Sequence, residues 1–361
     1  MEYKKRSKFI DVMKGILIAF VVIGHLPFFE YNSRTLTLIY SFHMPAFLII
    51  GGMLSHIDKN TKLSSIILKR IKTTLIPYFS FYIISFFLIP IDTSTTNHLA
   101  AVKAVFRGLG DPVNSINLPL WFLTFYFVAM TTFEIIEYIS YRISEKLSKK
   151  NNYQTIVILN LIFITIFMTI SYIYARIYKM PRLPFNIEVA TFCLLFVFIG
   201  KLISVYVKPI LNDIISSKPK RNKFIIVAFF VIILFTIIWY VYSMKNGRID
   251  LNARDYKNAL YMYCDAILGF IIFAYIGYII STIPFISSII SYIGKNSIYI
   301  LAYHIPSSYL AFNFIISYLP DVIRKMLSVN SIYSITILTS LYILISLVMS
   351  LIHKICNKIT H

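Results

Sequence analysis

The chain has 361 residues, of which 58% are hydrophobic and 14% are charged, and its formal net charge is +20. Soluble domains are about 45–50% apolar, and apolar strands in soluble α/β proteins are only about 4–8 residues long. The composition therefore excludes an ordinary soluble enzyme, and the scattering of its basic residues between apolar runs argues against nucleic-acid binding.

Ten apolar runs follow one another along the chain, each close to the roughly 20 residues that a helix needs to cross a bilayer. They predict an all-α integral membrane protein of about ten transmembrane helices in a single domain, 1–361. We expect no cleavable signal peptide and no soluble catalytic domain, so the spans themselves must carry any chemistry. The predicted spans are 9–28, 36–57, 74–91, 120–141, 153–176, 186–207, 223–244, 259–281, 297–318 and 331–354.

The basic residues are distributed unevenly between the two sides of the membrane that these spans define. The side that holds the N-terminus carries 22 of the 35 lysines and arginines, the other side carries 12, and Lys14 lies within a span. Because cytoplasmic loops carry the excess of basic residues, we predict a multi-pass protein of the cell membrane with both termini in the cytoplasm. The positive charge then serves topology and contact with anionic membrane lipids rather than nucleic acid.

The first span contains three ionisable residues, Asp11, Lys14 and His25. Eleven helical steps separate Lys14 from His25, which leaves an angular offset of only about 20°, and Asp11 is within side-chain reach of Lys14. Ionisable residues inside a membrane are expensive and indicate function by default. One face of this helix is thus predicted to line a polar path, and the alternative is a structural Asp11–Lys14 pair with an interfacial His25.

The second span places His43 and Pro45 before Gly51-Gly52. His43 is predicted at a membrane depth similar to that of His25, so the two imidazoles can converge. Proline and glycine are tolerated in membrane helices where neighbouring helices or a cavity compensate. Alone, His43 would favour a structural interpretation, but beside His25 it becomes a candidate for the site.

A basic cluster, Lys69-Arg70-Ile71-Lys72, precedes the third span. Positive-inside anchoring explains such a cluster as well as phosphate binding does. In the second interpretation Lys69 and Lys72 act as point charges and Arg70 binds bidentately.

The remaining polar positions carry less information. Glu134 and Glu137 are predicted to pair with cytoplasmic basic residues rather than to take part in catalysis, whereas Asp265 has no assigned role. Trp121 is more typical of an interfacial anchor than of a substrate platform. The three cysteines lack metal-ligand spacing, and no metal site is predicted. The cysteines are Cys193, Cys264 and Cys356.

Taken in order, these motifs resemble the acyltransferase-3 family of multi-spanning membrane acyltransferases, and most closely its fucose 4-O-acetylase-like branch. The resemblance is carried by Asp11 to Gly15 with His25, by Phe42-His43-Met44-Pro45 with Gly51-Gly52, by the basic cluster with Pro77-Tyr78, by Leu120-Trp121-Phe122-Leu123, and by Gly294-Lys295-Asn296-Ser297 leading to Tyr303-His304. The chain departs from the family pattern in having Lys14 where arginine is commoner.

The resemblance implies a membrane O-acyltransferase that moves an acetyl group from cytoplasmic acetyl-coenzyme A to a hydroxyl of a cell-surface carbohydrate or its lipid-linked precursor. His25 is then the general base, or else carries the acyl group. Lys14 and Asp11 organise the site, and His43 contacts the acceptor or stabilises developing charge. The resemblance brings Trp121 and His304 near the substrate, and Lys69, Arg70 and Lys72 would bind the phosphates of coenzyme A.

The competing function is a transporter or flippase for a polysaccharide or a lipid-linked sugar, which charged residues within spans and broken helices would also suit. We find no repeated hydrophobic pattern that relates two halves of the chain, and the polar residues crowd into its first third. Consumption of acetyl-coenzyme A distinguishes the two functions.

Overall fold

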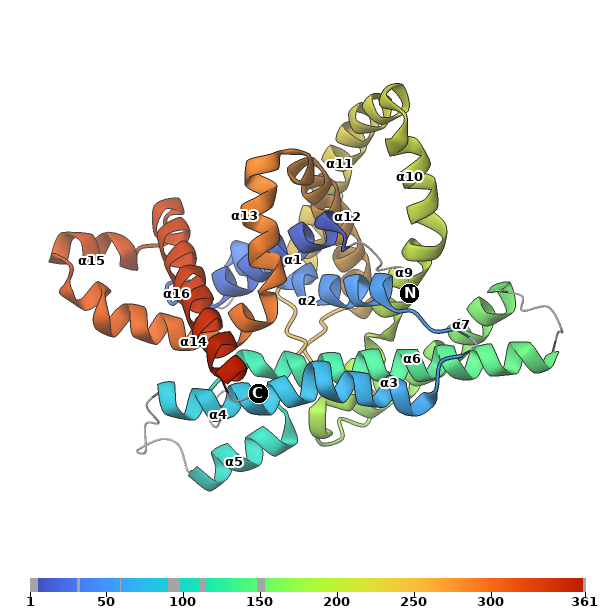
Figure 1. The fold of residues 1–361 in the computed structure, drawn as a ribbon, viewed down its shortest axis with the longest axis horizontal. Coiled ribbons are helices and arrows are strands. Elements are labelled where there is room, and N and C mark those ends of the chain that lie inside the picture. Colours follow the sequence, from blue (N-terminus) through green and yellow to red (C-terminus); the bar gives the residue numbers. More distant parts are fainter. Residues whose placement is uncertain are drawn as a thin grey trace. The chain divides into compact units, whose positions relative to one another are not determined.

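The computed structural model describes residues 6–30, 33–58, 60–89, 98–110, 115–147 and 153–359. Within these ranges the regular elements are all helices, and there is no strand apart from one isolated bridge between Asp250 and Asp255 (Figure 1). The all-α prediction is confirmed. Five of the basic residues in the topology argument lie outside the described residues, namely Lys4, Lys5, Lys59, Lys149 and Lys150. The segment from about 92 to 118, which the predicted topology places outside the cell, falls outside the described residues at 92–97 and 111–114.

Eight of the described helical segments are long and apolar enough to cross a membrane, and a ninth arises if the bent pair Pro284–Lys295 and Ser297–Tyr318 is one span. α1 (Lys8–Gly24) has 17 residues, or about 26 Å at 1.5 Å per residue, slightly less than the roughly 30 Å hydrocarbon core. It ends before the predicted boundary because Pro27 disfavours helical backbone at the residue before it. The predicted total of ten spans stays a prediction. It is reached if the bent pair counts as the ninth span and α1 as the tenth.

The described helices fall into two compact units. Unit 1 comprises Met1–Ala46, Ile225–Ile249 and Tyr256–His361, and unit 2 comprises Phe47–Phe224 and Asp250–Asp255. The boundary cuts α2 (Arg34–Leu54) after Ala46, one residue beyond Pro45, which lies inside that helix. That one membrane domain covers 1–361 stays a prediction.

Unit 1 is built on α1, which lies directly against α13 (Figure 1). Glycines permit this approach, because a Cβ at Gly294 would overlap the carbonyl of Asp11 and one at Gly15 would overlap the carbonyl of Ile290. The other helices of unit 1 are the first half of α2, α11 (Lys218–Asn246) from Ile225 onward, α12 (Ala259–Thr282), α13 (Pro284–Lys295), α14 (Ser297–Phe314), α15 (Asp321–Ser328) and α16 (Ile332–Ile359).

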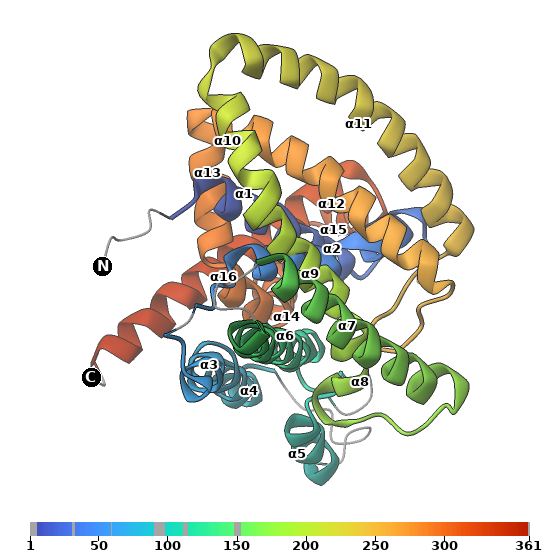
Figure 2. The same cartoon turned by 90° about the vertical axis from the view of Figure 1, so that its right-hand side faces the viewer.

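Unit 2 is organised around its longest helix, α6 (Trp121–Leu147), which contacts α3, α7, α8 and α9 (Figure 2). The second half of α2 crosses α9 so closely that a Cβ at Gly52 would overlap the carbonyl of Val197. The helices of unit 2, besides α2 and α6, are α3 (Leu63–Arg70), α4 (Ile76–Leu88), α5 (His98–Arg107), α7 (Tyr153–Tyr172), α8 (Ile187–Phe192), α9 (Leu194–Leu202) and α10 (Lys208–Ser216).

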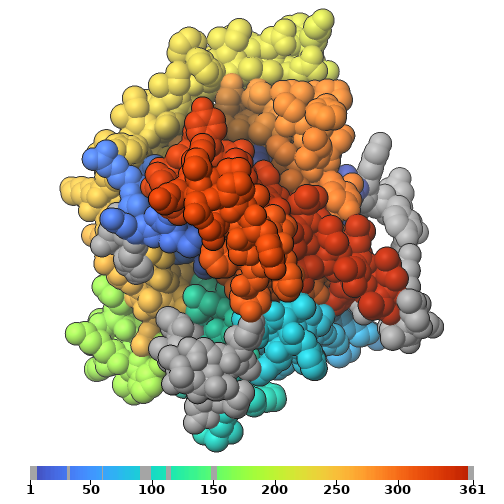
Figure 3. Space-filling model, turned by 90° about the vertical axis from the view of Figure 1, so that its left-hand side faces the viewer, coloured from blue at the N-terminus to red at the C-terminus, as the bar shows by residue number. Residues whose placement is uncertain are grey.

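Large apolar side chains are exposed along several helices, as a lipid environment requires. On α11, Ile226 and Phe230 are 60% and 65% exposed. The orange-red surface at the centre of Figure 3 belongs to the segment from the end of α14 through α15, where Phe314 and Met326 are exposed. This distribution fits a protein whose hydrophobic surface faces lipid rather than water.

Candidate active site

His25 sits at the C-terminal end of α1, immediately after the last helical residue. Its backbone N–H donates to the carbonyl of Val22 at 3.1 Å, which closes the last turn. This end of α1 faces α14, where the centroid of the His304 ring lies 5.2 Å from that of His25. Sequence reasoning gave His304 only a weak role, and the fold brings it into direct contact with the proposed base.

The hydrogen bonds of His304 fix its neutral tautomer. Its Nδ1 lies 3.0 Å from the carbonyl oxygen of Ile300 and 2.9 Å from that of Leu301. A carbonyl oxygen only accepts, so Nδ1 carries the hydrogen and Nε2 carries the lone pair. That Nε2 is buried and has no hydrogen-bond partner among the described residues. It is positioned to accept a proton.

His43 has the same arrangement near the middle of α2. Its Nδ1 lies 2.6 Å from the carbonyl oxygen of Ile39, so its Nε2 is also the acceptor in the neutral ring. The ring is buried, and its centroid lies 5.1 Å from that of Tyr40. His43 and His304 both interact electrostatically with His25, and the convergence of His25 and His43 stays a prediction.

Arg248 completes this group and was not predicted. It follows the end of α11, and its guanidinium carbon lies 4.1 Å from the centroid of the Tyr40 ring. Its positive charge acts on both His25 and His43. No spacing rule connects Arg248 to the histidines, and the only signal in the sequence was a basic residue on the side of the membrane where basic residues are fewer. We call His25, His43, His304, Tyr40 and Arg248 the histidine cluster.

Lys14 and Asp11 lie in the first half of α1, about 16 Å and about 21 Å from His25 along the helix. Asp11 is buried and forms a bidentate pair with Arg6, whose Nε and Nη2 lie 2.7 Å and 2.9 Å from its two carboxylate oxygens. This hydrogen-bonded pair raises the pKa of Arg6. Lys14 is partly exposed and interacts electrostatically with Asp11 and Arg6. The fold therefore does not bring Lys14 or Asp11 to the histidine cluster.

The Gly294 to Ser297 motif determines where His304 lies. Gly294 allows α13 to contact α1, and the chain then bends by 78° into α14. Asn296 stabilises this bend, because its Oδ1 accepts from Lys354 Nζ at 2.6 Å and its Nδ2 donates to the carbonyl of Tyr292 at 2.8 Å. The motif thus sets the path of the backbone between α13 and α14, and this path brings His304 next to His25.

Asp265 on α12 is fully buried, and neither carboxylate oxygen has a hydrogen-bond partner among the described residues. Its side chain lies beside that of Ser243 on α11.

The residues of the basic cluster before the third span have different surroundings in unit 2. Arg70 is buried and pairs with Glu134, Nε donating to Oε2 at 2.8 Å and Nη2 to Oε1 at 2.5 Å. Lys69 and Lys72 are exposed on the same helical stretch. The two lysines are open to solvent, whereas Arg70 pairs with a buried carboxylate.

A second buried pair adjoins the first. Lys201 Nζ lies 2.7 Å from Glu137 Oε1 and donates to the carbonyl of Ser55 at 3.2 Å. Ser55 Oγ in turn donates to Glu134 at 3.3 Å, which links the two pairs. Both glutamates therefore pair with basic side chains, as the sequence favoured.

Trp121 begins α6 and is buried among aromatic side chains of unit 2. Its ring centroid lies 5.4 Å from that of Phe125 and 6.1 Å from that of Phe122. Such packing is typical of an aromatic core. The structure gives Trp121 a packing role in unit 2 and leaves its substrate contact a prediction.

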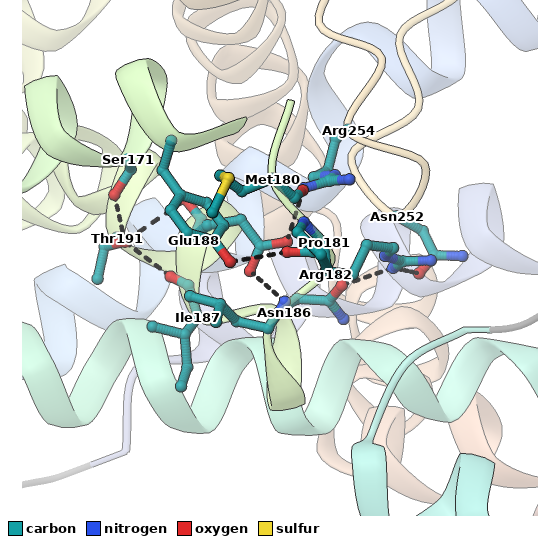
Figure 4. Close-up of polar contacts among 12 residues, drawn as sticks. Ser171, Met180, Pro181, Arg182, Asn186, Ile187, Glu188, Thr191, Asn252 and Arg254 are labelled. Atoms are coloured by element: carbon teal, nitrogen blue, oxygen red, sulfur yellow. Dashed lines mark hydrogen bonds and ion pairs between the residues drawn. The ribbon is translucent and has the colours of Figure 1, made fainter. Parts of the chain in front are cut away.

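A further polar cluster in unit 2 joins the segments around 180–188 and 250–255 (Figure 4). Arg182 Nη2 donates to Asn186 Oδ1 at 2.6 Å and to Asn252 Oδ1 at 3.0 Å, and Arg254 Nη1 lies 3.6 Å from Glu188 Oε1. Burial lowers the pKa of Arg182. Asn186 and Arg254 have φ angles of 53° and 59°, a strained backbone that these side-chain contacts hold in place.

Among the described residues, no group of three or more histidine, cysteine, aspartate or glutamate side chains is arranged to hold a metal ion. A search of the curated proteins and a search of the solved structures each found no match. A family model described as an acyltransferase domain matches residues 7–352, which include every residue of the histidine cluster. The chain therefore belongs to the acyltransferase-3 family of membrane acyltransferases.

Proposed function

We propose that this acyltransferase moves an acetyl group from cytoplasmic acetyl-coenzyme A to a hydroxyl group of a cell-surface carbohydrate or of its lipid-linked precursor, as in the fucose 4-O-acetylase-like branch. The observation that carries the proposal is the contact between His25 and His304, where Nε2 of His304 is buried and has no hydrogen-bond partner in the described part of the chain. A hydroxyl is a poor nucleophile at neutral pH, and a positioned imidazole is the usual base that activates it.

In this proposal His25 takes the proton of the acceptor hydroxyl as its oxygen adds to the thioester carbonyl. His25 is the most exposed of the three histidines, because it follows the end of α1 and is half-buried, whereas His43 and His304 are buried. His304 and His43 flank it and present acceptor nitrogens. Lys69 and Lys72 attract the phosphates of the donor, and Lys14 with Asp11 organises the other end of α1.

The test is transfer of labelled acetyl groups from acetyl-coenzyme A to membranes of a strain that lacks this protein, which carry the unacetylated acceptor. Wild-type protein should transfer label, and mass spectrometry of the surface glycan should show the added acetyl ester. His25→Ala should lower turnover by about 10²–10⁴-fold, the usual contribution of a general base. His43→Ala should lower it by a smaller factor.

The matched control is His56→Ala, which removes an exposed histidine of unit 2 that is not in the histidine cluster. It should leave turnover unchanged. If well-folded His25→Ala keeps turnover within about threefold of wild type while His304→Ala loses it, His304 is the base. If wild-type protein consumes no acetyl-coenzyme A, the proposed reaction is wrong.

A further inference from the structure

Addition of a hydroxyl to a thioester places a negative charge on the former carbonyl oxygen, so the site needs a hydrogen-bond donor or a cation at that atom. His43 and His304 do not meet this need in their neutral forms. Each donates its Nδ1–H to a backbone carbonyl, and each therefore presents only a lone pair at Nε2. The donor must therefore come from another group in the site.

Arg248 is the permanently charged member of the histidine cluster. Its guanidinium lies over the face of Tyr40, and the ring of Tyr40 lies beside that of His43. Its charge also acts on His25. A guanidinium keeps its protons at every working pH and offers up to five N–H donors, whereas the flanking histidines offer acceptors.

We propose that Arg248 is a catalytic residue whose guanidinium binds the oxyanion formed on the thioester carbonyl, and that Tyr40 is the positioning residue that holds it. The inference rests on the proposed function. The acceptor oxygen bonds to the carbonyl carbon, its proton passes to His25, and the π electrons of the carbonyl move to the oxygen at Arg248. When the carbonyl reforms, the C–S bond breaks, and the thiolate of coenzyme A takes the proton from His25.

Tyr40 supplies a π face rather than a charge. A cation over an aromatic ring is worth about 0.5–2 kcal/mol, or roughly 2- to 30-fold when converted at 1.4 kcal/mol per tenfold. Tyr40→Phe keeps this face, and Tyr40→Leu removes it. Tyr40→Leu should therefore lower kcat by about tenfold, and Tyr40→Phe should lower it by a clearly smaller factor.

The experiment measures initial rates of acetyl transfer from acetyl-coenzyme A to membranes of the strain that lacks this protein, together with the affinity of purified variants for coenzyme A. Arg248→Gln should lower kcat by about 10²–10³-fold, the usual effect of removing one oxyanion donor. The KM for acetyl-coenzyme A and the Kd for coenzyme A should stay within about threefold, because the oxyanion exists only after the donor is bound. Arg248→Lys, which keeps the charge, should recover part of the loss.

The matched control is Lys245→Gln. Lys245 belongs to the same helix end and lies over the ring of Tyr261 at 5.3 Å, so it is another cation on an aromatic face. Its removal should not change kcat. Coenzyme A binding reports folding of each variant, and Arg248→Lys provides the test if Arg248→Gln fails to fold.

Two results would overturn the inference while the proposed function stands: a kcat of Arg248→Gln within threefold of wild type, or a raised KM with kcat unchanged, which would make Arg248 a ground-state binding residue. Should Arg248→Gln not fold, an Arg248→Lys variant with full kcat and Tyr40→Leu with full kcat would together overturn it. A wild-type protein that transfers no acetyl group would instead overturn the proposed function.

Discussion

Removing Arg70 should destabilise unit 2 far more than removing either neighbouring lysine. The Arg70 and Glu134 side chains are 10% and 1% exposed, and the pair is bidentate. Substituting Arg70 by Gln leaves a buried carboxylate without its cation, which typically costs about 3–5 kcal/mol. At about 2–4 °C per kcal/mol for a unit of this size, the Tm should fall by on the order of 10 °C.

The matched variants are Lys69→Gln and Lys72→Gln, because both lysines lie exposed on the same helical stretch. Each should change stability by no more than about 0.5 kcal/mol. If these lysines bind the donor phosphates, the double lysine variant should raise the KM for acetyl-coenzyme A without lowering the Tm. Neutralising all three basic residues together would mix the two effects, and Arg70 is therefore tested by itself.

The assay is thermal unfolding of detergent-purified protein, followed with a thiol-reactive dye. A double variant, Arg70→Met with Glu134→Leu, removes both charges at once and should recover most of the lost Tm, since apolar replacement of a buried ion pair is often close to neutral. An Arg70→Gln variant that unfolds at the same temperature as Lys69→Gln would refute the argument. So would a double variant no more stable than the single one.

Gly294→Ala should lower both the Tm and turnover, because the new Cβ would overlap the carbonyl of Asp11 and force α13 away from α1, displacing α14 and His304; unchanged stability and activity would show that the contact is loose. The predicted topology places position 97 outside and position 151 in the cytoplasm. Single cysteines at Asn97 and Asn151 should therefore differ in labelling by an impermeant external reagent, and labelling of position 151 but not of 97 would reverse the orientation.

The sequence by itself determined the fold class and most helix positions. The length of an apolar run is a local property set by the thickness of the bilayer, so counting residues predicts where a helix crosses. The pairing of Glu134 and Glu137 with basic side chains also followed from the cost of burying a carboxylate alone. Family membership agreed with the ordered motifs from the first span to His304.

Only the tertiary structure decided which of the polar residues meet. On α1 the regular 100° turn aligns Lys14 with His25, but their partners come from different elements, so one faces Arg6 and Asp11 and the other faces His304. The basic residues before the third span also differ in their surroundings, because successive positions on a helix point in different directions. Of these residues, Arg70 is the one that faces Glu134. Hydropathy and spacing describe one helix at a time, whereas the histidine cluster is formed by contacts between helices distant in the chain. That is why Arg248 carried no recognisable signal.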